Sequence, residues 1–179
     1  MHHFNRREDR LFAENVDVTA IAENIGTPFY CYSTATLRQH YTRLKDAFAQ
    51  NEVTICYSVI ANSNLGVIAT LADLGSGADV VSEGELRRAL LSGIPAEKIV
   101  FSGVGKTEAE MTYALNADIA QFNVESRAEL EQLSEVATKQ GKTARISLRV
   151  NPDIDAGTHE KISTGRAENK FGIAWDEAE

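Results

Sequence analysis

Short apolar runs alternate with longer segments that mix apolar and polar positions at helical spacing, from residue 53 to residue 150. The runs cover residues 53–59, 77–81, 99–101, 119–124 and 143–150. Their first residues lie 24, 22, 20 and 24 positions apart, which is the spacing of successive strand–helix units. Because connections between parallel strands are right-handed, the pattern predicts an α/β fold whose parallel sheet is either doubly wound or part of a barrel.

The segments between these runs carry their own helix signals. Capping residues stand at the expected helix starts, namely Ser63, Thr107 with Glu110, and Ser126 with Glu129. The last two pairs match the capping box, in which the first side chain and the third helical residue bond reciprocally. Gly93 and Gly141 stand where two of these helices are expected to end.

The first 52 residues follow a different rhythm and are predicted to form a separate N-terminal segment, with residues 53–179 as the second unit. Asp17 is the predicted N-cap of a short helix that Gly26 ends. The aromatic run at residues 29–32 predicts a short strand. Ser33 then caps a longer helix with one buried stripe.

Chain length bears on the choice between barrel and open sheet. A closed (β/α)8 barrel takes about 250 residues. The 179 residues supply five strand–helix units and the beginning of a sixth, so a barrel would be incomplete. An incomplete barrel leaves two strand edges unpaired, and such edges favour association, so we expect a homo-oligomer.

Composition narrows the classes of partner. The chain is 43% hydrophobic and 25% charged, which is typical of a globular protein, and its net charge of -8 with no basic run argues against nucleic acid and anionic membranes. The sequence has neither a secretory signal nor a run of about 18 apolar residues, so we expect a cytoplasmic protein. Cys31 and Cys56 lack Cys or His neighbours, which predicts reduced, buried thiols and no metal site.

Two glycine-containing segments invite comparison with nucleotide-binding loops. Residues 103–107 follow a predicted strand and open a helix, as a phosphate-binding loop does. However, Val100 stands where that loop requires glycine, so we predict a tight turn with Thr107 as N-cap. Residues 75–77 precede their strand instead of following it, which indicates an ordinary turn.

Polar residues gather where the predicted strands end, the edge at which parallel barrels carry their functional groups. They are residues 60–64, Asp79 with Ser82 and Glu85, residues 102–103, Asn123 with Glu125, and residues 149–152. Any one of them could instead be a cap or turn residue, and for Asn62 and Ser82 both interpretations stay open. After Asn151 the regular spacing breaks into a polar connection of 151–165, which suits either a lid or a flexible excursion.

Several of these segments together resemble consecutive blocks of bacterial diaminopimelate decarboxylase, in the same order and spacing. The blocks are residues 57–64, 75–86, 100–107, 149–152, 158–165 and 169–173. The resemblance implies a partial alanine-racemase-like barrel with pyridoxal phosphate (PLP) at its mouth, a second β domain from later sequence, and a homodimer with active sites at the interface. It also implies removal of carbon dioxide from meso-diaminopimelate to give lysine, with PLP holding the electron pair.

The resemblance also assigns candidate site residues. Asp79 and Glu85 match acidic residues near the cofactor, and Arg149 matches a basic residue below the ring, although Arg149 and Glu85 might simply pair with each other. Asn62 and Ser82 are further candidates for cofactor contacts. The mobile active-site loop of the family corresponds to residues that include His159, Ser163, Thr164 and Gly165.

Ile60 is the main departure from the family pattern. It stands where the family keeps the lysine that anchors PLP and returns a proton, and isoleucine can do neither. Lys106, Lys161 and Lys170 are other amines, but the family pattern points none of them at the cofactor.

The family's later elements, including the second β domain, should follow Glu179. Together with Ile60, their absence predicts a truncated and inactive member of the family. A non-catalytic assembly or binding module, and an active enzyme of the same cofactor class with another amino acid as substrate, are the alternatives.

Overall fold

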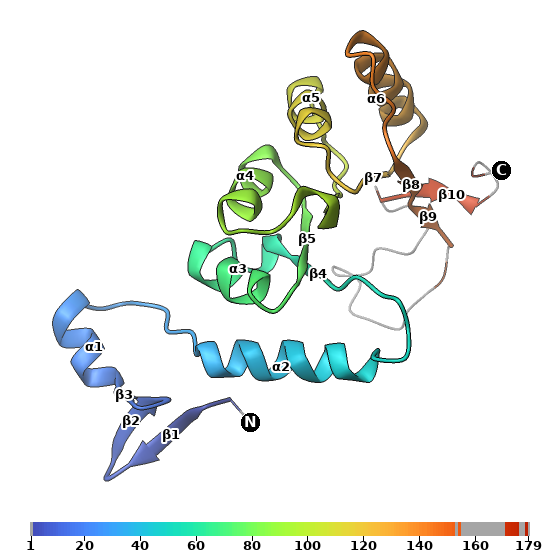
Figure 1. Ribbon diagram of the computed structural model, residues 1–179. Helices are drawn as coiled ribbons and strands as arrows, with labels where there is room; N and C mark the ends of the chain where they lie inside the picture. Colours follow the sequence, from blue (N-terminus) through green and yellow to red (C-terminus); the bar gives the residue numbers. More distant parts are fainter. Residues whose placement is uncertain (1, 153, 155–170, 176–177, 179) are drawn as a thin grey trace.

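A five-stranded parallel sheet forms the centre of the computed structural model, which describes residues 2–152, 154, 171–175 and 178 (Figure 1). The strands follow one another in chain order, each paired with the next. They are β4 (Cys56–Ser58), β5 (Gly77–Val80), β6 (Ile99–Phe101), β7 (Gln121–Val124) and β8 (Ile146–Leu148). The predicted parallel strands are therefore confirmed, although pairing covers fewer residues than the apolar runs.

A helix follows each of the first four strands of this sheet. These helices are α3 (Leu65–Ala72), α4 (Glu83–Leu91), α5 (Glu108–Ala117) and α6 (Arg127–Lys139), and the short 3-10 helices η1 (Val59–Ala61) and η2 (Ala96–Lys98) precede α3 and β6. Consecutive helices contact each other, so they cover one face of the sheet. A doubly wound sheet would have helices on both faces, so this arrangement is that of a partial barrel.

Alternation along the strands separates the helix-covered face from the inner face of the barrel. In β5, Ala78 and Val80 are fully buried, whereas Asp79 between them is only partly buried. Phe101 and Phe122 are register partners on neighbouring strands and stack with ring centroids 6.1 Å apart. The core thus lies between sheet and helices, and polar side chains can occupy the inner face.

Side-chain caps fix where the helices begin. Thr107 and Glu110 form the predicted capping box at α5. Asn64, and not the predicted Ser63, caps α3, because the Asn64 side chain accepts a hydrogen bond from the N–H of Gly66. Ser126 caps α6 as predicted, but the Glu129 carboxylate accepts from Glu125 instead of closing the box on Ser126.

Glycines end two helices as predicted. Gly93 and Gly141 have φ angles of 90° and 63°, in the left-handed region that L side chains avoid. Gly75 has a φ of 91° in the turn before β5, so residues 75–77 form the expected turn. In the described part of the chain, no helix combines the length and the apolar character that crossing a membrane requires.

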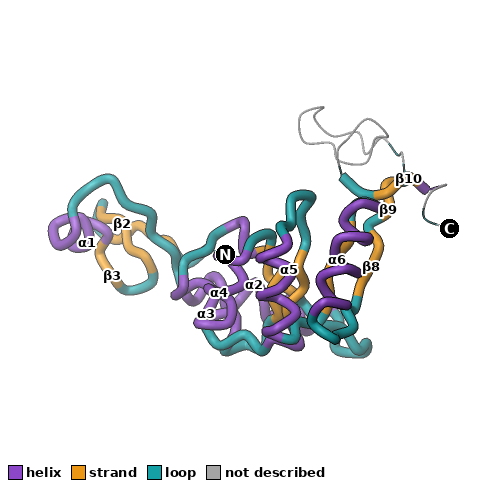
Figure 2. The backbone as a smooth tube through the Cα atoms, turned by 90° about the horizontal axis from the view of Figure 1, so that it is seen from above, coloured by secondary structure: helices purple, strands orange, loops and turns teal. Residues whose placement is uncertain are grey.

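The N-terminal segment contains a small antiparallel sheet that the hydrophobic pattern did not predict. It consists of β1 (Phe4–Arg7), β2 (Arg10–Ala13) and β3 (Val16–Asp17). The helices α1 (Val18–Ile25) and α2 (Thr34–Ala47) follow, with Asp17 and Ser33 as N-caps, as predicted. Figure 2 shows this sheet and α1 at one end of the molecule, with α6 and β8 at the other.

The predicted strand at residues 29–32 is wrong. These residues are irregular and have no strand beside them. Tyr30 is 90% exposed, and its ring stacks on Tyr32 with the centroids 6.4 Å apart. A strand requires a ladder partner, and no described segment supplies one here.

A sixth strand begins at the far edge of the sheet. After Arg149 the chain continues as β9 (Val150–Asn151), which pairs in parallel with β10 (Ile173–Ala174). Gly172 before β10 has a φ of 79°, and a Cβ atom there would lie 2.9 Å from the carbonyl oxygen of Arg149. Only glycine fits so close an approach.

A groove of about 400 Å³ lies between α2 and the edge strand β4. Leu37, Tyr41 and Leu71 contribute to its apolar lining. Among the described residues, β4 pairs only with β5, so its other edge is open. Cys56 on β4 and Cys31 are free thiols that are half-buried, so the prediction of reduced thiols holds and that of full burial is wrong.

Candidate functional site

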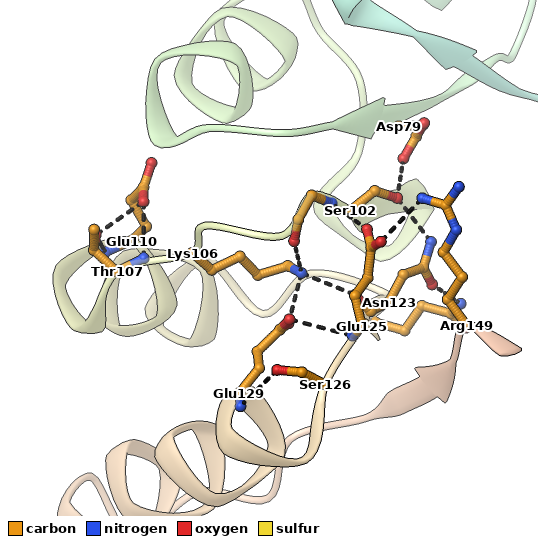
Figure 3. Close-up of polar contacts among 12 residues, drawn as sticks. Asp79, Ser102, Lys106, Thr107, Glu110, Asn123, Glu125, Ser126, Glu129 and Arg149 are labelled. Carbon is orange, nitrogen blue, oxygen red and sulfur yellow. Dashed lines mark hydrogen bonds and ion pairs between the residues drawn. The ribbon is translucent and has the colours of Figure 1, made fainter. Parts of the chain in front are cut away.

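A chain of hydrogen bonds crosses the inner face of the sheet at the carboxyl ends of its strands and converges on Asp79 (Figure 3). The Ser102 hydroxyl donates to Oδ1 of Asp79 at 2.5 Å, and Asn123 Nδ2 donates to Ser102 Oγ at 2.9 Å. Behind Asn123, the amide of Gln121 donates to its Oδ1 at 2.9 Å. From the other side, Ser58 Oγ lies 3.5 Å from Oδ2 of Asp79.

The hydrogen bonds of this series therefore lead to the Asp79 carboxylate. Its direct neighbours are Ser58 on β4 and Ser102, which follows β6. These hydrogen bonds fix the orientation of a carboxylate on the inner face of the sheet.

The 3-10 helix η1, which follows β4, carries Ile60 at this edge. Its side chain is 67% exposed, whereas the neighbouring Val59 is fully buried. The phenol of Tyr57 donates to the carbonyl of Asn62 at 3.0 Å, and the Asn62 side chain accepts from the N–H of Asn64 at 2.9 Å. The turn interpretation of Asn62 is thus confirmed, and the same turn holds Ile60 in place.

Ser82 and Glu85 serve the start of α4. Ser82 Oγ accepts from the N–H of Glu85 at 3.2 Å, which confirms the cap interpretation of Ser82. Oε2 of Glu85 accepts from the N–H of Val81 at 2.9 Å. The suggestion that Glu85 pairs with Arg149 is wrong, because the guanidinium of Arg149 lies 3.0 Å from Oε2 of Glu125 instead.

Arg149 stands between β8 and β9 and carries a positive charge at this edge. Its side chain is 41% exposed, and the guanidinium carbon lies 4.9 Å from the centre of the Phe171 ring. The Glu125 side chain is only 1% exposed, and its other oxygen accepts from the N–H of Gly103 at 2.9 Å. Arg149 is thus held by a carboxylate that is itself fixed to the loop after β6.

Lys106 forms a buried ion pair that the sequence reasoning missed. Its Nζ lies 2.6 Å from Oε1 of Glu129, with side-chain exposures of 0% and 7%. The amine donates to three protein acceptors, which supports the prediction that residues 103–107 form a turn and not a phosphate-binding loop. The nearest sequence signal was Glu129 at the third position of its helix, where we expected it to bond within the cap.

Burial and neighbouring charge shift the titration of three groups around this edge. Burial raises the pKa of the Cys56 thiol, and the negative Asp79 adds to the effect. Burial, together with the nearby Tyr32, also raises the pKa of Tyr57. For Glu110 burial acts upward, but hydrogen bonds from the N–H groups of Thr107 and Glu83 hold its pKa below the usual value.

Some expected site residues cannot be placed. His159, Ser163, Thr164 and Gly165 lie outside the described residues, as do Lys161 and Lys170. Over the described ranges, no three His, Cys, Asp or Glu side chains converge in a way that would hold a metal ion. The described site is therefore made of Asp79, Ser102, Asn123, Glu125 and Arg149, with Ile60 beside them.

Sequence relatives place these residues in context. A family model described as the pyridoxal binding domain of pyridoxal-dependent decarboxylases matches residues 34–179. Diaminopimelate decarboxylase of Vibrio cholerae is 54% identical over 179 residues, which is 99% of this chain and 43% of the relative. The chain thus spans less than half the length of the curated relatives that it matches.

Solved structures agree with the sequence relatives. Diaminopimelate decarboxylase of Helicobacter pylori, complexed with L-lysine, superposes with a TM-score of 0.87 and 47% identity over 90% of this chain and 41% of that chain. The enzyme of M. jannaschii gives a TM-score of 0.88 and 40% identity over 97% of this chain and 41% of that chain. The chain therefore belongs to the family of pyridoxal-dependent decarboxylases, within their pyridoxal binding domain.

Proposed function

We propose that this chain supplies the first part of the PLP-binding barrel of a diaminopimelate decarboxylase, with the cofactor at the edge lined by Asp79, Ser102 and Arg149. One observation carries the proposal: a polar layer converges on Asp79 at the carboxyl ends of parallel strands whose other face is covered by helices. The relatives named above are diaminopimelate decarboxylases, one of them complexed with L-lysine, which supports meso-diaminopimelate as substrate and lysine as product.

The described residues fit non-covalent contacts with a polar aromatic cofactor. Arg149 offers a half-exposed guanidinium, and Asp79 a carboxylate that four neighbouring side chains orient directly or in series. In the proposed arrangement these two groups would hold the cofactor at the carboxyl ends of the strands. Bound PLP would supply an electron sink for the electron pair left when carbon dioxide departs.

Covalent attachment of the cofactor does not fit. Ile60 occupies the exposed position after β4 at which the family resemblance places a lysine, and its side chain has no amine. Lys106 cannot substitute, because its amine is fully buried and donates three hydrogen bonds to protein acceptors. We therefore propose that the chain does not decarboxylate meso-diaminopimelate by itself.

Introducing an amine at residue 60 tests whether this residue lies at the cofactor site. Ile60→Lys should gain a covalent pyridoxal label after incubation with PLP and borohydride reduction, located by mass spectrometry of the peptide that contains residue 60. Ile25→Lys is the matched control, because Ile25 is equally exposed at 67% but lies on α1. Labelling of both variants to the same extent would contradict the placement of residue 60 at the cofactor site.

Activity tests the second half of the proposal. The unmodified chain, supplied with PLP and meso-diaminopimelate, should release no carbon dioxide above the level of a heat-treated sample. Turnover at a rate ordinary for enzymes, about 1 per second or faster, would refute the inactive assignment.

A non-catalytic assembly module is the second candidate, and one observation favours it. The edge of β4 is open among the described strands and lies beside an apolar groove of about 400 Å³. Such an edge can add a strand from another copy of the chain, which would also agree with a family homodimer. Light scattering after size exclusion should then give twice the mass of 19.6 kDa. A monomer at all concentrations would exclude this candidate.

A further inference from the structure

The side chain of Lys106 is fully buried, which is unfavourable for a charged amine. Its three donor hydrogens have three acceptors: the carbonyl of Gly103 at 2.7 Å, the carbonyl of Asn123 at 2.8 Å, and Oε1 of Glu129 at 2.6 Å. These acceptors belong to the loop after β6, to β7 and to the first turn of α6, so one amine joins three neighbouring segments (Figure 3).

The ion pair continues toward the mouth through the second oxygen of Glu129. Oε2 of Glu129 accepts from the N–H of Glu125 at 3.2 Å and so fixes the backbone at the end of β7. The Glu125 carboxylate then accepts hydrogen bonds from the N–H of Gly103 and from the guanidinium of Arg149. Gly103, whose carbonyl already binds Lys106, thereby closes the network into a ring.

Stability alone does not account for such a pair. Removing two charges from water costs several kcal/mol for each ion, and well-packed apolar residues often replace a buried pair without loss of stability. The more specific effect of this pair is geometric, because its hydrogen bonds restrain Gly103, Asn123 and Glu125, and Glu125 binds the guanidinium of Arg149.

We propose that Lys106 and Glu129 are positioning residues that fix the carboxylate of Glu125 and, through it, the guanidinium of Arg149 at the barrel mouth. The proposal goes beyond the proposed function, because it concerns where Arg149 is held and not what Arg149 binds. Replacing the pair by apolar residues should therefore release Arg149 even where the fold is retained.

The test compares variants of the full chain by NMR of the arginine Nη–H signals, because Nη1 of Arg149 donates to Glu125. The signal of Arg149 is identified by its absence in Arg149→Lys. In Lys106→Met/Glu129→Leu, solvent exchange of this N–H should become at least about tenfold faster and approach that of Glu125→Gln, which loses the charge that holds Arg149 directly. The matched control Lys139→Met/Glu108→Leu removes an exposed ion pair of 3.0 Å and should leave the exchange unchanged.

An unchanged Arg149 signal in the folded double variant would overturn the proposal. If that variant does not fold, Glu129→Gln decides, because its side-chain amide has the size of the carboxylate but only one accepting oxygen. Its NH2 group must face either the N–H of Glu125 or the amine of Lys106, so one of the two hydrogen bonds is lost. Exchange at Arg149 as slow as in the unmodified chain would again overturn the proposal. Failure of PLP to bind any variant would count against the proposed function and would leave this measurement intact.

Discussion

The hydroxyl of Ser102 lies 2.5 Å from Oδ1 of Asp79 and has Asn123 as its donor on the other side. A hydroxyl has one proton, so the bond from Asn123 leaves that proton committed to Asp79. Ser102, which follows β6, therefore controls the orientation of a carboxylate on β5.

Ser102→Ala should lower the free energy of unfolding by about 1–2 kcal/mol, because it removes the hydroxyl donor of Asp79 Oδ1 and the acceptor of Asn123 Nδ2. Urea denaturation followed by circular dichroism measures the change. Ser134→Ala, at an exposed position of α6, is the control and should stay within about 0.5 kcal/mol. Equal effects of the two substitutions would show that the bond to Asp79 contributes nothing.

Leu86 and Leu91 provide a pair of tests for the core. Both belong to α4, but Leu86 is fully buried and Leu91 is 75% exposed. Leu86→Ala should destabilise the chain by about 2–5 kcal/mol through lost burial and the cavity left behind. Leu91→Ala should change stability by less than about 0.5 kcal/mol in the same denaturation experiment. A reversed order would mean that α4 packs on the sheet through its other face.

Glu14 links the N-terminal sheet to α2 in a pH-dependent way. Its Oε1 accepts from the N–H of Ala35 at 2.9 Å and from the hydroxyl of Ser33 at 2.8 Å, and these bonds lower the pKa of Glu14 below its ordinary value. A lowered pKa in the folded state means that ionised Glu14 adds stability above pH 4.5, and that this stability is lost as the pH falls through the lower, folded value.

Glu14→Gln keeps the accepting oxygen and removes the charge. Its melting temperature should therefore lie below that of the unmodified chain at pH 7, and the two should converge as the pH falls below 4.5. A difference of the same size at pH 3 and pH 7 would rule out a contribution from the ionised carboxylate.

Cys56 should react slowly with alkylating reagents. Burial and the charge of Asp79 both raise the pKa of this thiol, which lowers the fraction of reactive thiolate at pH 8. In a Cys31→Ser background, iodoacetamide should modify Cys56 more slowly than it modifies the same chain unfolded in urea. Adding Asp79→Asn should increase the rate in the folded chain, and no increase would mean that burial acts alone.

The strand–helix alternation was predictable because each helix carries its own start and stop residues. Thr107, Ser126, Gly93 and Gly141 act locally, within one turn of chain, so their roles follow from sequence. The hydrophobic spacing alone could not distinguish a barrel from a doubly wound sheet, because it is the same whether helices cover one face or both. The family resemblance predicted the partial barrel.

The N-terminal sheet was missed for a reason visible in its turns. Glu8, Asp9 and Glu14 adopt positive φ angles of 49°, 63° and 56°, positions at which glycine or asparagine would have signalled a hairpin. The strands themselves are short, and β1 is mostly exposed, so they show no alternation. At residues 29–32 a strand was predicted that does not exist. Aromatic residues favour strands, but a strand also requires a neighbouring strand to pair with.

The candidate site was predicted in its location and not in its connections. Asp79, Asn123, Glu125 and Arg149 were expected at the strand ends because topology alone brings these ends together. Arg149 pairs with Glu125, which lies 24 positions away in the sequence. Sequence patterns do not show which of the carboxylates at the strand ends comes within hydrogen-bond distance. The ion pair of Lys106 with Glu129 joins residues 23 apart and has no local signature.

The parallel pairing of β9 with β10 brings the residues on either side of the segment 152–172 together in one sheet. The register therefore couples Ile173 and Ala174 to the backbone that carries Arg149, although these residues are far apart in the sequence. A change in either short strand thus acts on the position of the other.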